Sequence, residues 1–102
     1  MYIYNVTINV EDSVHDEWLD WMKKDHIPDM LNTGKFKNAN LFKVNVQEPT
    51  GGTTYAVHYI TDSKEELQNY YNNYAHQLRN EGSKFKDKVV VFRTELDVIA
   101  QF

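Results

Sequence analysis

The sequence contains no cysteine, and this absence excludes several kinds of site. A disulfide scaffold, a thiolate nucleophile and a thiolate zinc centre all need cysteine sulfur. Long apolar runs are missing too, since no stretch approaches the roughly 20 residues that a membrane-spanning helix requires. The first strand-like pattern begins without the apolar leader of a signal peptide. We therefore expect a cytoplasmic protein that does not associate with membranes.

Basic residues are too few and too scattered to predict nucleic-acid binding. The chain has 15 acidic residues against 11 basic ones, and its net charge is −4. Phosphate recognition needs a clustered basic face. The nearest such group consists of Arg79, Lys84, Lys86 and Lys88. We interpret it as a solvated helix end and loop, so we expect no nucleic-acid partner.

Familiar catalytic and cofactor motifs are also absent. The chain has no Ser-His-Asp signature, no glycine-rich phosphate loop and no pair of carboxylates in a catalytic arrangement. His15, His26 and Asp29 follow no established spacing of metal ligands. We expect neither a metal site nor a cofactor.

Hydrophobic periodicity predicts a strand and then a helix in the first third of the chain. Apolar side chains alternate with others over residues 2–10, as in a half-buried strand. Ser13 is a suitable N-cap for the helix that follows, and Pro28 either ends that helix or starts a new short turn. The apolar stripe of the helix consists of Val14, Trp18, Trp21 and Met22.

The rest of the chain predicts three strands and one helix. Residues 36–47 and 54–61 form an antiparallel hairpin, because the turn at 49–52 contains two glycines that can adopt positive φ. A capping box at 63–66 begins the second helix. Alternation over residues 88–99 predicts the last strand.

The order strand, helix, strand, strand, helix, strand indicates an α+β domain of ferredoxin-like type. The 102 residues suit one such domain over 1–102. Right-handed crossovers place both helices on one face of a four-stranded antiparallel sheet. We expect the other face to carry Ile3, Val89 and Val91 beside Asn5, Thr7 and Arg93.

A sheet face of this mixed composition predicts self-association. It is too apolar to stay fully wet and too polar to form a dry core, and a contiguous exposed apolar patch usually marks an interface. Two copies of the face can cover each other in a two-fold dimer. We expect a homodimer through the open sheet face, with a monomer whose mixed face stays solvated as the alternative.

The segment Trp18–Pro28, after a tyrosine-rich first strand, resembles the first helix of the dimeric α+β barrel superfamily. Many members of that superfamily carry a histidine and, two residues later, a proline at this helix end, as His26 and Pro28 do here. The whole chain is similar to a bacterial family, domain of unknown function 4286. That similarity rests on residues 4–10, 18–31, 51–55 and 92–96.

The resemblance implies a dimeric α+β barrel with a cleft between the paired sheets, and it implies no particular activity. Some members of the superfamily use this cleft for cofactor-free oxygenation of small aromatics, some for haem and some for lactone isomerisation. Haem-degrading members have a first-strand Asn, a third-strand Trp and a second-helix His. Asn5 and His76 match two of these positions, but both tryptophans here lie in the first helix.

Five residues are candidates for a site in such a cleft. His26 can serve as a general base near neutral pH, or it hydrogen-bonds a nearby carbonyl at the helix end. Asn5 and Thr7 can bind a ligand oxygen or pair across the dimer. We expect His58 to share their face. Arg93 can hold a carboxylate with two hydrogen bonds, or it pairs with an acid of the partner chain.

Three functions remain open from the sequence. The first is a small-ligand-binding or accessory dimer without catalysis. The second is a cofactor-independent monooxygenase or isomerase that acts on a small aromatic or lactone, with His26 as base and Asn5 as the partner of an oxyanion or oxygen. The third is a structural dimer that acts through a protein partner. Analogy between folds is a weak argument for any of them.

Overall fold

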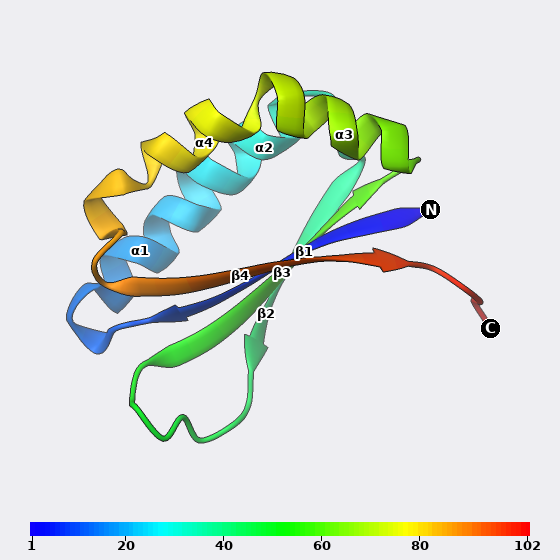
Figure 1. Ribbon diagram of the computed structural model, residues 1–102. Coiled ribbons are helices and arrows are strands. Elements are labelled where there is room, and N and C mark those ends of the chain that lie inside the picture. Colours follow the sequence, from blue (N-terminus) through cyan, green and yellow to red (C-terminus); the bar gives the residue numbers. More distant parts are fainter.

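A twisted four-stranded antiparallel sheet with helices on one face forms the structure (Figure 1). The computed structural model describes residues 1–102. Its strands lie in the order β2-β3-β1-β4, which confirms the ferredoxin-like α+β class. The strands are β1 (Tyr2–Val10), β2 (Asn38–Val44), β3 (Thr53–Thr61) and β4 (Val89–Asp97).

The first helical arm extends from residue 12 to residue 32 and changes its winding on the way. It comprises a 3₁₀ turn, α1 (His15–Trp21), a π-helical turn (Met22–His26) and α2 (Ile27–Asn32). At the π-helical turn the N–H of Ile27 donates to the carbonyl of Met22, five residues back instead of four. Pro28 is the second residue of α2. Of its two predicted outcomes, the start of a new helical turn is the correct one.

Ser13 does not cap α1, contrary to the prediction. It lies inside the 3₁₀ turn Asp12–Val14, and α1 begins only after this turn. The cause is the way in which the chain leaves β1. The N–H of Glu11 donates to the Lys88 carbonyl at 2.9 Å, and the Val14 N–H donates to the Glu11 carbonyl at 3.2 Å. These two bonds tighten the chain before the α-helix can start.

The second arm comprises α3 (Lys64–Asn73) and α4 (Ala75–Glu81). Ser63 Oγ accepts from the Glu66 N–H at 3.2 Å, which is half of the predicted capping box. The Glu66 carboxylate pairs with Lys35 at 3.5 Å instead of returning to Ser63. The two helices meet at Tyr74, whose φ of −130° interrupts the helix. No helix of the structure has the length and apolarity needed to cross a membrane.

The core lies between these two arms and the sheet, with Tyr4 of β1 at the centre of an aromatic cluster. The Tyr4 ring centroid lies 6.2 Å from that of Phe36, 6.0 Å from Tyr59, and 5.7 Å from both Tyr70 and Tyr71. Aromatic pairs at such separations add about 0.5–1.5 kcal/mol beyond the area they bury. The cluster therefore holds α3 and the loop before β2 against the middle of the sheet.

The open face of the sheet differs from the predicted one at β4. Arg93 pairs with Val6 of β1, and Val6 packs against the core. Arg93, Val89 and Val91 therefore point toward the helices, so their predicted place on the open face is wrong. Both rows of β4 begin with apolar residues, and alternation alone does not tell which row faces the core. On the open face β4 presents Val90, Phe92, Thr94 and Leu96.

We predict that two neighbouring glycines in the loop between β2 and β3 differ sharply in their tolerance of a side chain. Gly51 and Gly52 both have positive φ, at 85° and 78°. A Cβ on Gly52 would lie 2.7 Å from the Val10 carbonyl oxygen, whereas one on Gly51 meets nothing within 4 Å. Gly51→Ala should lower the free energy of unfolding by about 1–2 kcal/mol, the usual penalty for left-handed backbone.

Gly52→Ala should lower the free energy of unfolding by a further 1–3 kcal/mol or so, because the backbone of β1 has to move. Urea denaturation of both variants measures the difference. Because the backbone penalty is shared, Gly51→Ala is the matched control. Equal losses in the two variants would show that the loop does not press on β1.

Candidate functional site

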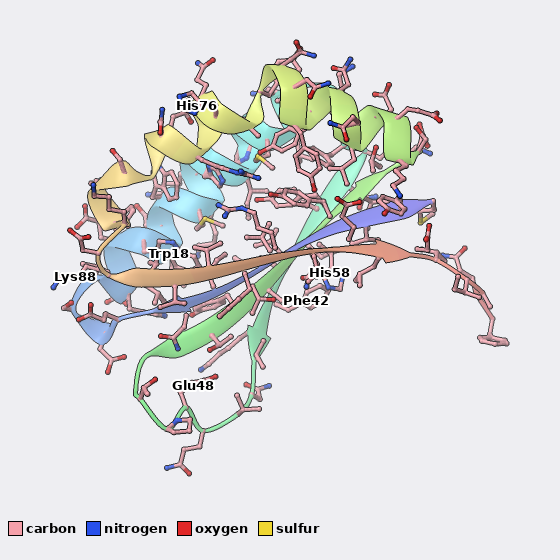
Figure 2. The ribbon with its side chains drawn as sticks, viewed as in Figure 1. Trp18, Phe42, Glu48, His58, His76 and Lys88 are labelled. Atoms are coloured by element: carbon pink, nitrogen blue, oxygen red, sulfur yellow. The ribbon has the colours of Figure 1, made fainter.

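A cavity lies between the helices and the β4 side of the sheet. Its volume is about 360 Å³. Trp18 lies in this layer between α1 and the sheet (Figure 2). The cavity has an almost fully buried floor of Tyr4, Trp18, Met22, Met30, Tyr59 and Tyr70.

His26 forms part of the cavity wall at the end of the π-helical turn. Its imidazole stacks on Trp21, with ring centroids 4.6 Å apart and an interplanar angle of 22°. Its Nδ1 is buried and has no hydrogen-bond partner. Burial is the main cause that lowers the pKa of His26 to about 4; the Asp29 charge opposes the shift and the Arg93 charge adds to it. The imidazole is therefore neutral at physiological pH.

Three cations from different elements stand around the rim of the cavity. Arg79 comes from α4, Lys86 from the loop that follows it and Arg93 from β4, and all three are exposed while the floor is buried. Arg79 Nη2 donates to Tyr4 Oη at 3.1 Å. This bond joins the rim to the hydroxyl of the central aromatic residue.

A second group of polar residues lies on the open face of the sheet. Asn5 pairs with His58 of β3 and with Thr94 of β4. Its Nδ2 donates to Thr94 Oγ1 at 3.1 Å and to Thr7 Oγ1 at 3.4 Å, while its Oδ1 is buried without a donor. The His58 ring packs edge-on against Phe42 at 5.0 Å, on the side of the sheet away from the helices (Figure 2).

The sheet therefore separates the five predicted site residues into two sets. Asn5, Thr7 and His58 come together on the open face, as predicted. His26 and Arg93 meet in the cavity on the opposite side. A single site made of all five is wrong, because one strand presents alternate residues to opposite faces. Whether either set binds or transforms a ligand stays a prediction.

Sequence reasoning missed Arg79 and the aromatic floor. The sequence predicts a solvated helix end and loop for Arg79 and Lys86. A signal for Arg79 existed, since it follows the buried Ala75 by four residues and the buried Leu78 by one, which places it at the edge of the buried stripe of α4. No comparable signal marked Tyr4, because core and cavity residues of a strand share one periodicity.

The haem-type arrangement suggested by Asn5 and His76 does not form. His76 is exposed on α4 and points away from the sheet (Figure 2), and its Nε2 contacts Asn80 Nδ2 at 3.2 Å. Asn5 lies on the far side of the sheet. The helical layer and the sheet both stand between the two residues.

Solved structures with the same arrangement of elements come from distant proteins. A dimeric ferredoxin-like protein from an uncultured marine organism has a TM-score of 0.73 and 9% identity, with 99% of this chain and 97% of that chain covered. A mutant of SnoaB, a cofactor-independent oxygenase from Streptomyces nogalater, has a TM-score of 0.70 and 6% identity over 98% and 95%. A protein of the ethyl tert-butyl ether (EthD) family from Bacillus halodurans has a TM-score of 0.68 and 13% identity over 95% and 100%.

At these identities the similarity shows the fold alone. No curated protein sequence matches the chain. A family model does match, and it covers residues 1–99, nearly the whole length. The family resemblance predicted from the sequence is thereby confirmed: the chain belongs to the family described as Domain of unknown function (DUF4286).

Proposed function

We propose that this protein binds a small organic molecule in the cavity between its helices and its sheet, as a cytoplasmic binding or accessory protein. The observation that carries the proposal is an aromatic-floored cavity of about 360 Å³ with a few polar groups on its wall and rim. Ligand sites have this character, with volumes of roughly 300–1,000 Å³, mostly apolar linings and few polar groups. The site lies within one protomer, not in a cleft between two sheets.

Binding should be detectable as stabilisation in a thermal-shift screen of small metabolites. A ligand at 100 times its Kd stabilises the folded state by about 2.7 kcal/mol, which raises the Tm of a chain of this size by roughly 10 °C or more. Trp18 and Trp21, the only tryptophans, both line the cavity, so their fluorescence reports occupancy. Val91→Phe, which fills the cavity from β4, should abolish the shift caused by any hit.

Val90→Phe is the matched control, because the adjacent residue places the same ring on the open face. It should leave the ligand-induced shift unchanged. A hit whose shift survives Val91→Phe and whose binding leaves tryptophan fluorescence unchanged binds elsewhere. That result would contradict the proposed location.

Catalysis with His26 as base is a second candidate, supported by the unpartnered Nδ1 of a histidine that lines the cavity. A neutral imidazole can accept a proton from a bound substrate. General bases work best with a pKa near the operating pH, and the pKa of His26 near 4 makes it a weak base in the ligand-free protein. We therefore place binding ahead of catalysis. Chemical conversion of a cavity ligand, lost in His26→Gln, would reverse that order.

The neutral burial of His26 predicts a specific loss of stability in mild acid. Its pKa is about 4 in the folded protein, against 6.5 for a fully solvated histidine such as the unfolded chain presents. Between these values the unfolded state binds more protons, so stability falls as the pH drops from about 6.5 to about 4, by at most roughly 3 kcal/mol.

Chemical denaturation at pH 7 and pH 4.5 measures this loss in the natural protein and in His26→Gln. The charged groups that face His26 are Asp29 of α2 and Arg93 of β4, and both remain in the variant. Carboxylates that titrate elsewhere affect the two proteins alike, so the difference isolates the imidazole. An equal loss in both proteins would mean that His26 is not desolvated.

We further propose that two copies of the chain pair through their open sheet faces. The accessible surface is 6585 Å², above the roughly 6,000 Å² expected of a compact monomer of 12.1 kDa. Four large side chains of this face are exposed, namely Phe42, Val90, Phe92 and Leu96. The buried Asn5 Oδ1 among them lacks a donor that a second copy can supply.

Phe92→Asp should dissociate this dimer. Phe92 is 65% exposed in the protomer, and a two-fold interface contains it twice. Loss of an aromatic anchor typically weakens an interface by 2 kcal/mol or more, about 30-fold in Kd. Sedimentation equilibrium checks the change, with Gln77→Asp on the exposed side of α4 as a control that should stay dimeric. A monomeric natural protein at micromolar concentration would contradict the pairing.

A structural dimer that acts through a protein partner is the remaining alternative. It requires no ligand in the cavity, and nothing in the structure favours it over small-molecule binding. The thermal-shift screen separates the two, since a purely structural domain gains no stability from any small molecule that contacts Trp18 and Trp21.

A further inference from the structure

The charge around the cavity is opposite in sign to that of the whole protein. The chain carries a net charge of −4, yet none of its 15 acidic residues lines the cavity. Both arginines of the chain, Arg79 and Arg93, stand at the rim together with Lys86. The protein as a whole is negatively charged, so its overall composition does not explain why positive charges gather at this rim.

None of these three cations is neutralised within the protomer. Every ion pair of the structure uses a lysine or His15, and neither Arg79, Arg93 nor Lys86 belongs to one. Arg79 donates one hydrogen bond, to Tyr4 Oη, and the Arg93 side chain donates none within the protomer. A guanidinium offers five N–H groups. The two guanidiniums that line the cavity therefore keep most of their donors free for a ligand.

The two arginines act on the same part of the cavity although they come from different elements. Burial raises the pKa of Tyr70 above its ordinary value and the neighbouring Tyr4 adds to the rise, while Arg79 and Arg93 both oppose it. Arg93 also lowers the pKa of His26. Both arginines line the cavity and act at the Tyr70 hydroxyl, and the Arg93 charge reaches the imidazole as well.

The position of Arg93 in the sheet decides which partner it can meet. Arg93 is on the helix-facing side of β4, so in a dimer formed through the open faces it points away from the second copy. The alternative that it pairs with an acid of the partner chain across that interface therefore loses its basis. A ligand in the cavity is the partner that its placement allows.

We propose that the cavity selects an organic anion, namely an aromatic carboxylate whose carboxylate is held at the rim by Arg93 and Arg79 and whose ring lies on the aromatic floor. This inference rests on the proposed function, because it names the class of molecule that the same cavity takes. The planar fork of a guanidinium matches the two oxygens of a carboxylate. The floor, formed by Tyr4, Trp18, Tyr59 and their neighbours, offers ring faces for stacking.

The matched probes 2-naphthoate and 2-naphthamide test this inference. They share the ring system and differ in one group, a carboxylate against a neutral amide. Isothermal titration calorimetry at pH 7.5 should give 2-naphthoate a Kd at least tenfold lower than that of 2-naphthamide. In Arg93→Gln the Kd of 2-naphthoate should rise about tenfold while that of 2-naphthamide stays within twofold, and Arg79→Gln should act in the same direction.

Lys64→Gln is the matched control, because Lys64 is exposed at the start of α3, lies outside the cavity and forms no ion pair. It removes one positive charge and should preserve the preference for 2-naphthoate. Thermal unfolding of each variant shows whether it is folded, and two arginine variants keep the test valid if one fails to fold.

The possible results separate this inference from the proposed function. Equal Kd values for the two probes, or a preference that survives both arginine variants, would overturn the anion selectivity and leave the binding cavity in place. If neither probe binds at millimolar concentration and the metabolite screen also finds no ligand, both the inference and the proposed function fail.

Discussion

The pairing register between β1 and β4 is the constraint on which the cavity wall and the open face of the sheet both depend. It sets Val6 opposite Arg93 and Asn5 opposite Thr94. Because neighbouring residues of a strand point to opposite faces, a slip by one residue would exchange the two rows of β4. Arg93 would leave the cavity, and Phe92 would enter it. Burial of Tyr4 and Ile8 beneath the helices fixes which face of β1 is the inner one, and pairing with β1 then decides which row of β4 faces the core.

Much of the fold is predictable from local sequence because several independent signals agree. The alternation of β1, the two glycines between β2 and β3, and the Ser63 cap each indicate the same order of elements. The face of β4 is not predictable in this way. Its first four residues are all apolar, so periodicity does not identify the inner row, and only pairing with β1 decides it. The winding of the first helical arm likewise depends on tertiary contacts.

The candidate site is predictable only in part, for a related reason. His26 stands out by its position before Pro28, and Arg93 by its charge in an apolar strand. Arg79 shows only its place at the edge of the buried stripe of α4 and Tyr4 shows no signal, because the features that make them part of a cavity arise only when α4 is packed over β1. Sequence patterns identify unusual residues more readily than they show which residues lie together in the folded protein. The division of the predicted residues between the two sheet faces depends on such spatial contacts.

The π-helical turn at Met22–His26 has a consequence for how this cavity can diversify among related chains. It holds one more residue per turn than an α-helix, so loss of a single residue would restore regular winding. The residues that follow would keep their faces, because the wide turn absorbs the extra residue without changing the phase of the helix. If the lost residue were His26, a different side chain would stand beside Trp21, while the sheet and the second arm stayed as they are. Evolution can thus change the chemistry of one wall through chain length, with no substitution at the wall itself.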